Sequence, residues 1–399
     1  MNKANNKTQK NTKPVKRKPK KKSSDSRFIL VGAVLLTVAV IILAGIVFSS
    51  DKVIDEGKVS SENSELLSTV SSDEMGFPVT FSNNDISRVE SFSSKIFVLG
   101  KKILTCVSDR GNVKYNYVFT FSKPDMTVSE KYGLVYDRAS SKYFIFNEKG
   151  VIFEGETENK KHIITAKINN RGDVAFVTKS DDSACRVSLV DKKGKVLYIW
   201  ACAEEYGVSI DLSEDSREIL CGAIGSLEGQ IYSKLYLLDT YSDEDVQEMT
   251  VNDGAVIDVA LSGRKAIATC NNSRTVFDVR RSGITEEKVL YPSNISNFAC
   301  DKSGNTVVVN DKIGSFSTRE ITVYNKNNVI SYIGFIDEEV VDVICRGKKV
   351  YVLTDAAIYE SSSDGTFSKV GTKEISGEGL VICKSRLYYH STGHIDINS

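Results

Sequence analysis

The chain has 399 residues, more than a single hydrophobic core requires, with 52 basic and 52 acidic residues. The neutral total hides two opposite parts: residues 1–27 hold eleven Lys or Arg and one acid, so the remainder has an excess of ten acidic residues. An acidic main part argues against nucleic acid as its ligand.

The N-terminal 75 residues divide into a tail, an apolar run and a stalk. Residues 1–27 have no hydrophobic period, which predicts a basic, disordered tail. Residues 28–48 form an uncharged run of 21 residues, FILVGAVLLTVAVIILAGIVF, which as a helix spans about 30 Å of hydrocarbon. Residues 49–75 are rich in Ser, Glu and Asp and contain no aromatic residue, so we expect a flexible, mildly acidic stalk.

The flanking charges predict the topology of this segment. Lys and Arg immediately before residue 28 favour a cytoplasmic N-terminus, with everything after residue 48 outside the membrane. We interpret the run as an uncleaved transmembrane anchor, because it is longer than the roughly 7–15 apolar residues of a signal peptide. Cleavage of a signal peptide near residues 49–50 is the alternative.

From residue 76 the apolar residues alternate with a period of two, and a unit of short apolar runs recurs eight times, about every 42 residues. The first runs of the units are residues 89–92, 126–129, 163–168, 208–212, 256–260, 295–298, 340–344 and 380–383. Second and third runs follow in every unit, and fourth runs are recognisable in several, for example at 113–119 and 196–200. Four antiparallel strands in a unit of this length are typical of a propeller blade. The expected fold class is therefore all-β, with a β-propeller over residues 76–399 preceded by one transmembrane helix.

The ends of the repeat region predict how the ring closes. The eighth unit has no fourth run before residue 399, and the strand-like residues 77–81 belong to no unit. We expect residues 77–81 to complete the last blade, because an unpaired edge strand promotes aggregation and Pro78 is tolerated on an outer strand. Eight blades follow from this pairing, and seven are the alternative if the first and last units merge.

Several stretches of the sequence carry a resemblance to a known family. They are residues 76–79 (GFPV), 133–137 (GLVYD), 164–178 (ITAKINNRGDVAFVT) and 233–239 (SKLYLLD). The chain resembles, over its whole length, a family of membrane-anchored propeller proteins of Gram-positive Firmicutes that is known as a domain of unknown function. Residues 211–220 are also similar to the strand–turn–strand unit of WD40-like propellers. The resemblance implies a membrane anchor and a propeller, and it brings no catalytic residue with it.

Motifs for catalysis, metals and cofactors are missing from the sequence. There is no G-x-S-x-G nucleophile motif, and the glycine-rich residues 222–229 lack the Lys-Ser/Thr ending of a phosphate-binding loop. The histidines His162, His390 and His394 do not form a recognisable ligand set, so we expect no metal and no cofactor.

The eight cysteines follow the repeat and form no C-x-x-C pair. We interpret most of them as small buried hydrophobic residues. A disulfide such as Cys185–Cys202 is compatible with an extracytoplasmic location, but the sequence does not assign a pairing.

Two connections between second and third runs, residues 222–233 and 311–318, are the longest of their kind, and we interpret both as loops on one face of the ring. Loops on a rigid scaffold are where binding concentrates, although simple variation in loop length is the alternative interpretation. The candidate binding residues are Gly225, Ser226, Glu228, Gln230, Gly314, Ser315 and Phe316.

These patterns favour a membrane-anchored, extracytoplasmic binding or scaffolding module of the cell envelope that is not an enzyme. Its expected partners are the bilayer through residues 28–48, anionic lipid headgroups through the basic tail, and an envelope protein through the loop face. The alternative is a sensor or an enzyme that acts on an envelope glycan inside the central channel, where Asp211, Asp258 and Asp342 would be the candidate residues.

Overall fold

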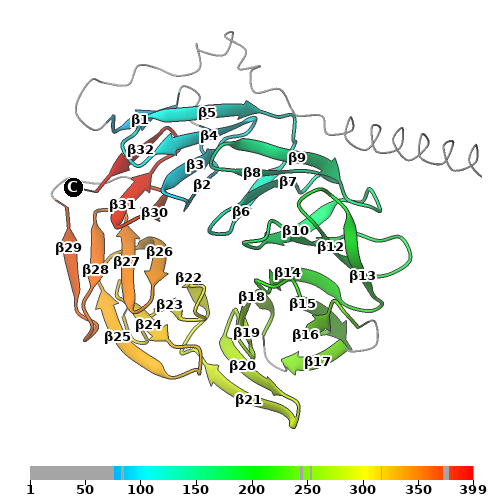
Figure 1. Ribbon diagram of the computed structural model, residues 1–399. Helices are drawn as coiled ribbons and strands as arrows, with labels where there is room; N and C mark the ends of the chain where they lie inside the picture. Colours follow the sequence, from blue (N-terminus) through cyan, green and yellow to red (C-terminus); the bar gives the residue numbers. More distant parts are fainter. Residues whose placement is uncertain are drawn as a thin grey trace, which may run out of the picture. The chain divides into compact units, whose positions relative to one another are not determined.

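Eight four-stranded antiparallel sheets are arranged as a ring around a central channel in the computed structural model (Figure 1). The structure describes residues 76–81, 85–242, 246–251, 254–315, 317–371 and 377–398, all of which belong to the compact unit Glu62–Ser399. The tail, the transmembrane run and the stalk predicted for residues 1–75 lie outside the described residues. In the described part of the chain, no helix has the length and apolar character needed to span a bilayer.

The strands follow one another from the channel outward in each of the first seven blades. The innermost strands are β2 (Arg88–Phe92), β6 (Pro124–Val128), β10 (Ile163–Ile168), β14 (Tyr206–Leu212), β18 (Val256–Ser262), β22 (Ile295–Cys300), β26 (Val340–Arg346) and β30 (Gly379–Cys383). The second strands are β3 (Lys95–Leu99), β7 (Gly133–Asp137), β11 (Val174–Thr178), β15 (Glu218–Leu227), β19 (Lys265–Cys270), β23 (Thr306–Asp311), β27 (Lys349–Thr354) and β31 (Arg386–His390). The third strands are β4 (Ile103–Ser108), β8 (Lys142–Asn147), β12 (Cys185–Val190), β16 (Gln230–Asp239), β20 (Ser273–Arg280), β24 (Arg319–Tyr324), β28 (Ile358–Ser361) and β32 (His394–Ile397). The outer strands are β5 (Val113–Val118), β9 (Gly150–Glu156), β13 (Val196–Cys202), β17 (Val246–Val251), β21 (Gly283–Leu290), β25 (Ile330–Ile336), β29 (Phe367–Val370) and β1 (Val79–Thr80).

This arrangement confirms the predicted fold class, and the ring has eight blades rather than seven. Each of the eight first runs predicted from the sequence coincides with an innermost strand to within two residues at each end. The second strands are buried almost throughout, as in β7 and β11, where every residue is buried. Outer strands such as β25 alternate instead between buried and exposed residues, since one face packs on a neighbouring blade and the other meets solvent.

The ring closes through a strand from the start of the described sequence. Val79 pairs with Ile395 and Thr80 with His394, so β1 forms the outer strand of the blade that contains β30, β31 and β32. Phe77 and Val79 are buried against this blade, and the Phe77 ring lies 5.2 Å from that of Tyr388, centroid to centroid. The predicted closure by residues 77–81 is therefore confirmed.

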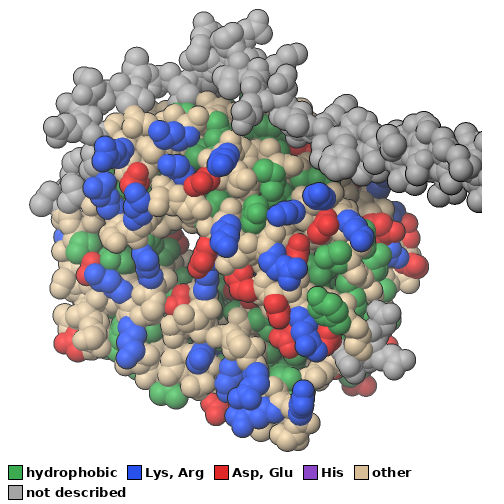
Figure 2. All heavy atoms as spheres, viewed as in Figure 1, with side chains coloured by type: hydrophobic (Ala, Val, Ile, Leu, Met, Phe, Trp, Pro, Cys, Tyr) green, Lys and Arg blue, Asp and Glu red, His purple; other side chains and the backbone are tan. Residues whose placement is uncertain are grey.

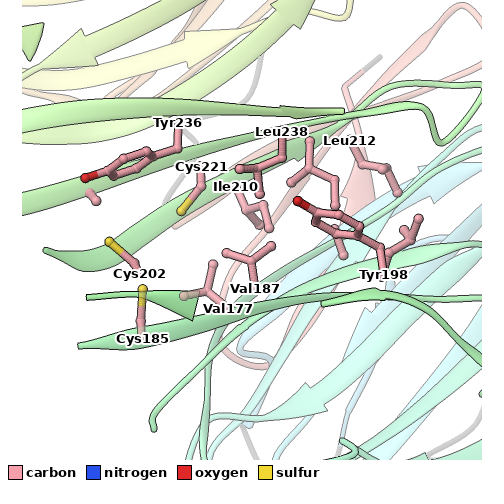
Figure 3. Close-up of a cluster of buried hydrophobic side chains, with 14 residues drawn as sticks. Val177, Cys185, Val187, Tyr198, Cys202, Ile210, Leu212, Cys221, Tyr236 and Leu238 are labelled. Carbon is pink, nitrogen blue, oxygen red and sulfur yellow. The ribbon is translucent and has the colours of Figure 1, made fainter. Parts of the chain in front are cut away.

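Apolar side chains fill most of the seams between neighbouring blades. One cluster joins the blades of β10–β13 and β14–β17 through residues such as Val177, Tyr198 and Leu212, as Figure 3 shows. The seam between β18–β21 and β22–β25 differs, because the described residues give it a cluster of only three buried apolar residues: Tyr291, Val308 and Tyr324. Its remaining space must be filled by something other than apolar packing.

A fully buried arginine occupies this seam. Arg274 on β20 donates from Nε to Thr306 Oγ1 at 3.2 Å, from Nη1 to Asn328 Oδ1 at 2.6 Å and from Nη2 to the carbonyl oxygen of Gly304 at 2.9 Å. All three acceptors are neutral, and burial lowers the pKa of Arg274. Because buried polar groups are costly when they lose their partners, this side chain ties the fifth blade to the sixth.

We expect the Arg274→Met variant to lower the free energy of unfolding by about 3 kcal/mol, because it leaves three buried acceptors without a donor. Urea denaturation of the variant and of the parent chain measures the change. The matched control is Arg264→Met, which removes an exposed arginine and should change stability by less than about 0.5 kcal/mol. Equal midpoints for the two variants would show that Arg274 does not stabilise the seam.

Candidate functional site

The segment 222–233 forms a β-hairpin and not the loop that its glycines suggested. Strands β15 and β16 are each ten residues long and pair without interruption from Glu218–Asp239 to Leu227–Gln230. Only Glu228 and Gly229 form the turn, with φ angles of 51° and 82°, which a two-residue hairpin turn requires. The loop prediction was wrong because the glycines serve close packing: a Cβ on Gly225 would lie 2.3 Å from Cζ of Tyr232.

The end of this hairpin projects beyond the rest of its blade. The pairing of β14 with β15 ends at Tyr206–Ile224, and the pairing of β16 with β17 ends at Ser233–Val251. Residues 225–232 therefore form strand pairs only with each other. We call these residues the hairpin tip, and they include the predicted binding residues Gly225, Ser226, Glu228 and Gln230.

The hairpin tip exposes apolar as well as polar side chains. Leu227 is 69% exposed and Ile231 is 60% exposed, and Tyr206 at the base of the hairpin is 64% exposed. Ser226, Glu228 and Gln230 are exposed around them. A small apolar centre with a polar rim is the composition of many protein interfaces.

A buried carboxylate holds the base of the hairpin. Glu205, between β13 and β14, accepts hydrogen bonds from the hydroxyls of Tyr232 and Tyr236 and forms an ion pair with Lys234 at 2.8 Å. Burial by itself raises the pKa of Glu205, but the bonds from Lys234, Tyr236 and Tyr232 outweigh it and lower that pKa to about 2. Sequence reasoning missed Glu205, because nothing in the local pattern marks a carboxylate whose partners lie 27 to 31 residues away.

The second predicted loop is a true connection. Residues 312–318 join β23 to β24, and Gly314 and Ser315 lie in it, whereas Phe316 is outside the described residues. Ile313 is 75% exposed, and Ser315 donates to Thr318 at 2.9 Å. Both this connection and the hairpin tip join a second to a third strand, so they leave the same end of their blades, with one blade between them.

The central channel is hollow and lined by charges of both signs. One cavity of about 640 Å³ is lined by residues that include Lys167, Asp211 and Asp258. Another of about 1040 Å³ is lined by residues that include Arg88, Glu90 and Asp342. Figure 2 shows basic and acidic side chains side by side around the hollow of the ring.

The channel carboxylates that sequence reasoning singled out are used to join blades. Asp211 on β14 accepts a hydrogen bond at 2.7 Å from the amide of Leu261 on β18. Asp342 on β26 accepts one at 2.8 Å from the amide of Leu380 on β30. Each of these carboxylates therefore stabilises the seam to the next blade.

Asp258 on β18 is the third of these carboxylates. Its Oδ1 accepts from the hydroxyl of Ser209 on β14 at 3.1 Å, and the same hydroxyl accepts from the amide of Val259. Lys167 lies 3.6 Å from Asp211 and has a raised pKa, chiefly because of the Asp211 charge. Burial raises the pKa of Asp258 and raises that of Asp342 to about 6.

The histidines show no metal-binding arrangement in the described residues. No group of three His, Cys, Asp or Glu side chains is placed to hold an ion there. His394 Nδ1 lies 2.8 Å from the hydroxyl of Ser391, and burial lowers the pKa of His390.

Comparison with known proteins identifies the family. A family of unknown function, DUF5711, matches residues 68–378. The chain belongs to the DUF5711 family. No curated protein matches this DUF5711 chain.

Solved structures similar to this DUF5711 chain share its fold. BamB from Moraxella catarrhalis has a TM-score of 0.54 at 11% identity, covering 83% of this chain and 99% of its own. The computationally designed Ika8 protein has a TM-score of 0.58 at 10% identity, covering 78% of this chain and 95% of its own. Apo AztD from Citrobacter koseri has a TM-score of 0.50 at 12% identity, covering 74% of this chain and 86% of its own. Identities this low support a shared fold and no shared function.

We expect Asp342→Asn to flatten the dependence of stability on pH between about pH 4 and pH 6. The folded-state pKa of Asp342 is raised from 3.8 to about 6, so the native chain binds more protons than the unfolded chain in this window, and stability falls as the pH rises. Asn cannot ionise, so we expect the free energy of unfolding of the variant, relative to that of the parent, to rise by about 2 kcal/mol between pH 4 and pH 7.5. Urea denaturation at both pH values measures this.

The control is Asp355→Asn, an exposed position in the β27–β28 connection, which should keep the parent profile. If the stability of Asp342→Asn depends on pH in the same way as that of the parent chain, Asp342 is not the titrating group.

Proposed function

We propose that this DUF5711 protein is a membrane-anchored, extracytoplasmic module that binds a protein of the cell envelope and catalyses no reaction. Its contact surface would consist of the hairpin tip and residues 312–318. The proposal rests chiefly on one observation, which is a projecting hairpin with Leu227 and Ile231 exposed and a base fixed by a buried carboxylate.

The rigidity of the hairpin base favours binding. Tyr232 and Lys234 both contact Glu205, which is itself 1% exposed, so the strands that lead to the tip are held before any partner arrives. A preorganised surface loses less conformational entropy on association, and more of the contact energy is then available for affinity. Exposed Ile313 would extend the apolar contact on the same end of the ring.

The location in the proposal comes from the N-terminal sequence. The apolar run 28–48 and the basic residues before it favour a single-pass anchor with the propeller outside the membrane. The basic tail would contact anionic lipid headgroups on the cytoplasmic side.

The channel supports a second candidate function, which is sensing or cleaving an envelope glycan. The observation in its favour is a hollow lined by carboxylates, one of which has a pKa of about 6. Against it, Asp211 and Asp342 each bind a backbone amide of the next blade. A carboxylate committed in this way is poorly placed to transfer a proton to a substrate, so we favour the binding role.

The test places a photo-crosslinking amino acid at Gln230 or Ser315 of the full-length chain in cells that naturally produce it. We expect one recurrent envelope protein among the adducts, and at least a tenfold loss of that adduct when Leu227 is changed to Glu, because a charge enters the apolar centre of the contact. Mass spectrometry of the adducts measures both.

The matched control is Val118→Glu, which places the same charge at a 52% exposed apolar position on β5 in the first blade. It should leave the adduct unchanged. Glycan adducts, or a protein adduct that Leu227→Glu does not reduce, would contradict the proposed surface and favour the channel.

A further inference from the structure

Three cysteines meet behind the hairpin, where the third and fourth blades join. Cys185 is on β12, Cys202 on β13 and Cys221 on β15, and all three are buried and recorded as free thiols. Figure 3 shows Cys185 and Cys202 next to each other at this join, with Cys221 close by. Gly207 makes room for them, since a Cβ there would lie 3.1 Å from the sulfur of Cys185 and 3.2 Å from that of Cys221.

Cys185 and Cys202 have the backbone spacing that a disulfide requires. They are directly opposite each other in the antiparallel pair β12–β13. Opposite residues of such a pair have Cα atoms about 4.5–5.5 Å apart, which lies within the range of about 4.4–6.8 Å seen in disulfides. The two thiols are also close enough to hydrogen-bond to each other.

Other cysteines of the described chain have different surroundings. Cys221 lies opposite Ile210 and Tyr236, so no cysteine faces it within its sheet. Cys345 donates to the carbonyl oxygens of Ala299 and Asn305 at 3.7 and 3.8 Å, and Cys300 donates to that of Asp301 at 3.6 Å. The pair on β12 and β13 is therefore the one that the backbone register sets face to face.

We propose that Cys185 and Cys202 are a modification site that a thiol–disulfide oxidant converts into an intrachain disulfide. The Cys202 thiolate attacks one sulfur of the oxidant's disulfide, forming a mixed disulfide and releasing one thiol. Cys185, after losing its proton, then attacks the Cys202 sulfur and releases the second thiol. The two cysteines lose two protons and two electrons, and one oxidant disulfide becomes two thiols.

The surroundings of Cys202 suit the attacking role. Its pKa is lowered, first by the hydrogen bond from Cys185 and also by the backbone amides of Glu204 and Glu205, although burial acts in the opposite direction. The residues that follow it, Ala203 and Glu204, are exposed at the end of β13. The oxidant therefore reaches the pair while the chain folds, or when the end of β13 opens.

Oxidation would change the base of the hairpin as well as the blade edge. The Cys202 thiol now donates to Oε2 of Glu205 at 3.5 Å, and the disulfide has no proton to donate. Glu205 keeps Tyr232, Tyr236 and Lys234, so the hairpin stays attached while β13 becomes covalently joined to β12. The disulfide site is independent of the proposed binding role and is tested separately.

The test refolds the full-length chain with oxidised glutathione as the probe, blocks the remaining thiols with an alkylating agent and digests the product with trypsin. We expect the peptide 180–186 to be linked to 196–217, with a combined mass two hydrogen atoms lower than that of the separate peptides. Each peptide contains one cysteine, so the linkage is unambiguous. The denatured product should titrate six free thiols rather than the eight of the reduced chain.

Cys185→Ser and Cys202→Ser should each leave seven free thiols after the same treatment. Cys221→Ser is the matched control, since it removes a neighbouring buried thiol and should retain the 180–186 to 196–217 link. Eight free thiols after oxidation of the parent chain, or a link from Cys202 to Cys221, would overturn the proposal. The parent experiment decides the question even if a serine variant does not fold.

Discussion

The pairing of β1 with β32 is the constraint on which the rest of the molecule depends. Seven blades are built from consecutive strands, but the eighth takes its outer strand from residues about 300 positions earlier in the sequence. Without it, β32 would present an unpaired edge, and Tyr388 would lose the Phe77 ring that covers it. Closure turns eight small sheets, each too small to be stable alone, into one ring in which every blade has two neighbours.

The seams between blades then decide what the side chains are free to do. Most seams are apolar, and polar groups on the innermost strands join the blades near the channel through bonds such as Asp211 to Leu261 and Asp342 to Leu380. Carboxylates used in this way maintain the ring. The hairpin tip has the opposite character, because Leu227 and Ile231 leave most of their apolar surface exposed.

Much of the fold could be predicted because strand alternation is a local signal. A period of two residues and a repeat of about 42 residues located all eight inner strands and the closing strand. The site was harder to predict. The sequence suggested a loop because it contains Gly222, Gly225 and Gly229. Two of these glycines instead make room within a strand: Gly222 for Val259 and Gly225 for Tyr232. Glu205 and Arg274 were missed because their partners come from distant positions, and no local pattern encodes such contacts.

Hydrogen exchange at the closing strand tests ring closure most directly. It is followed by mass spectrometry of peptides that cover residues 76–81 and 394–398. The amide of Phe81 donates to the carbonyl of Gly393 at 2.8 Å, and that of Gly76 donates to Arg110 at 2.8 Å. Closure predicts that these peptides exchange as slowly as the outer strands of other blades, such as β9 and β25. Rapid exchange of residues 76–81 and 394–398, with the other blades protected, would mean an open ring and would contradict the account.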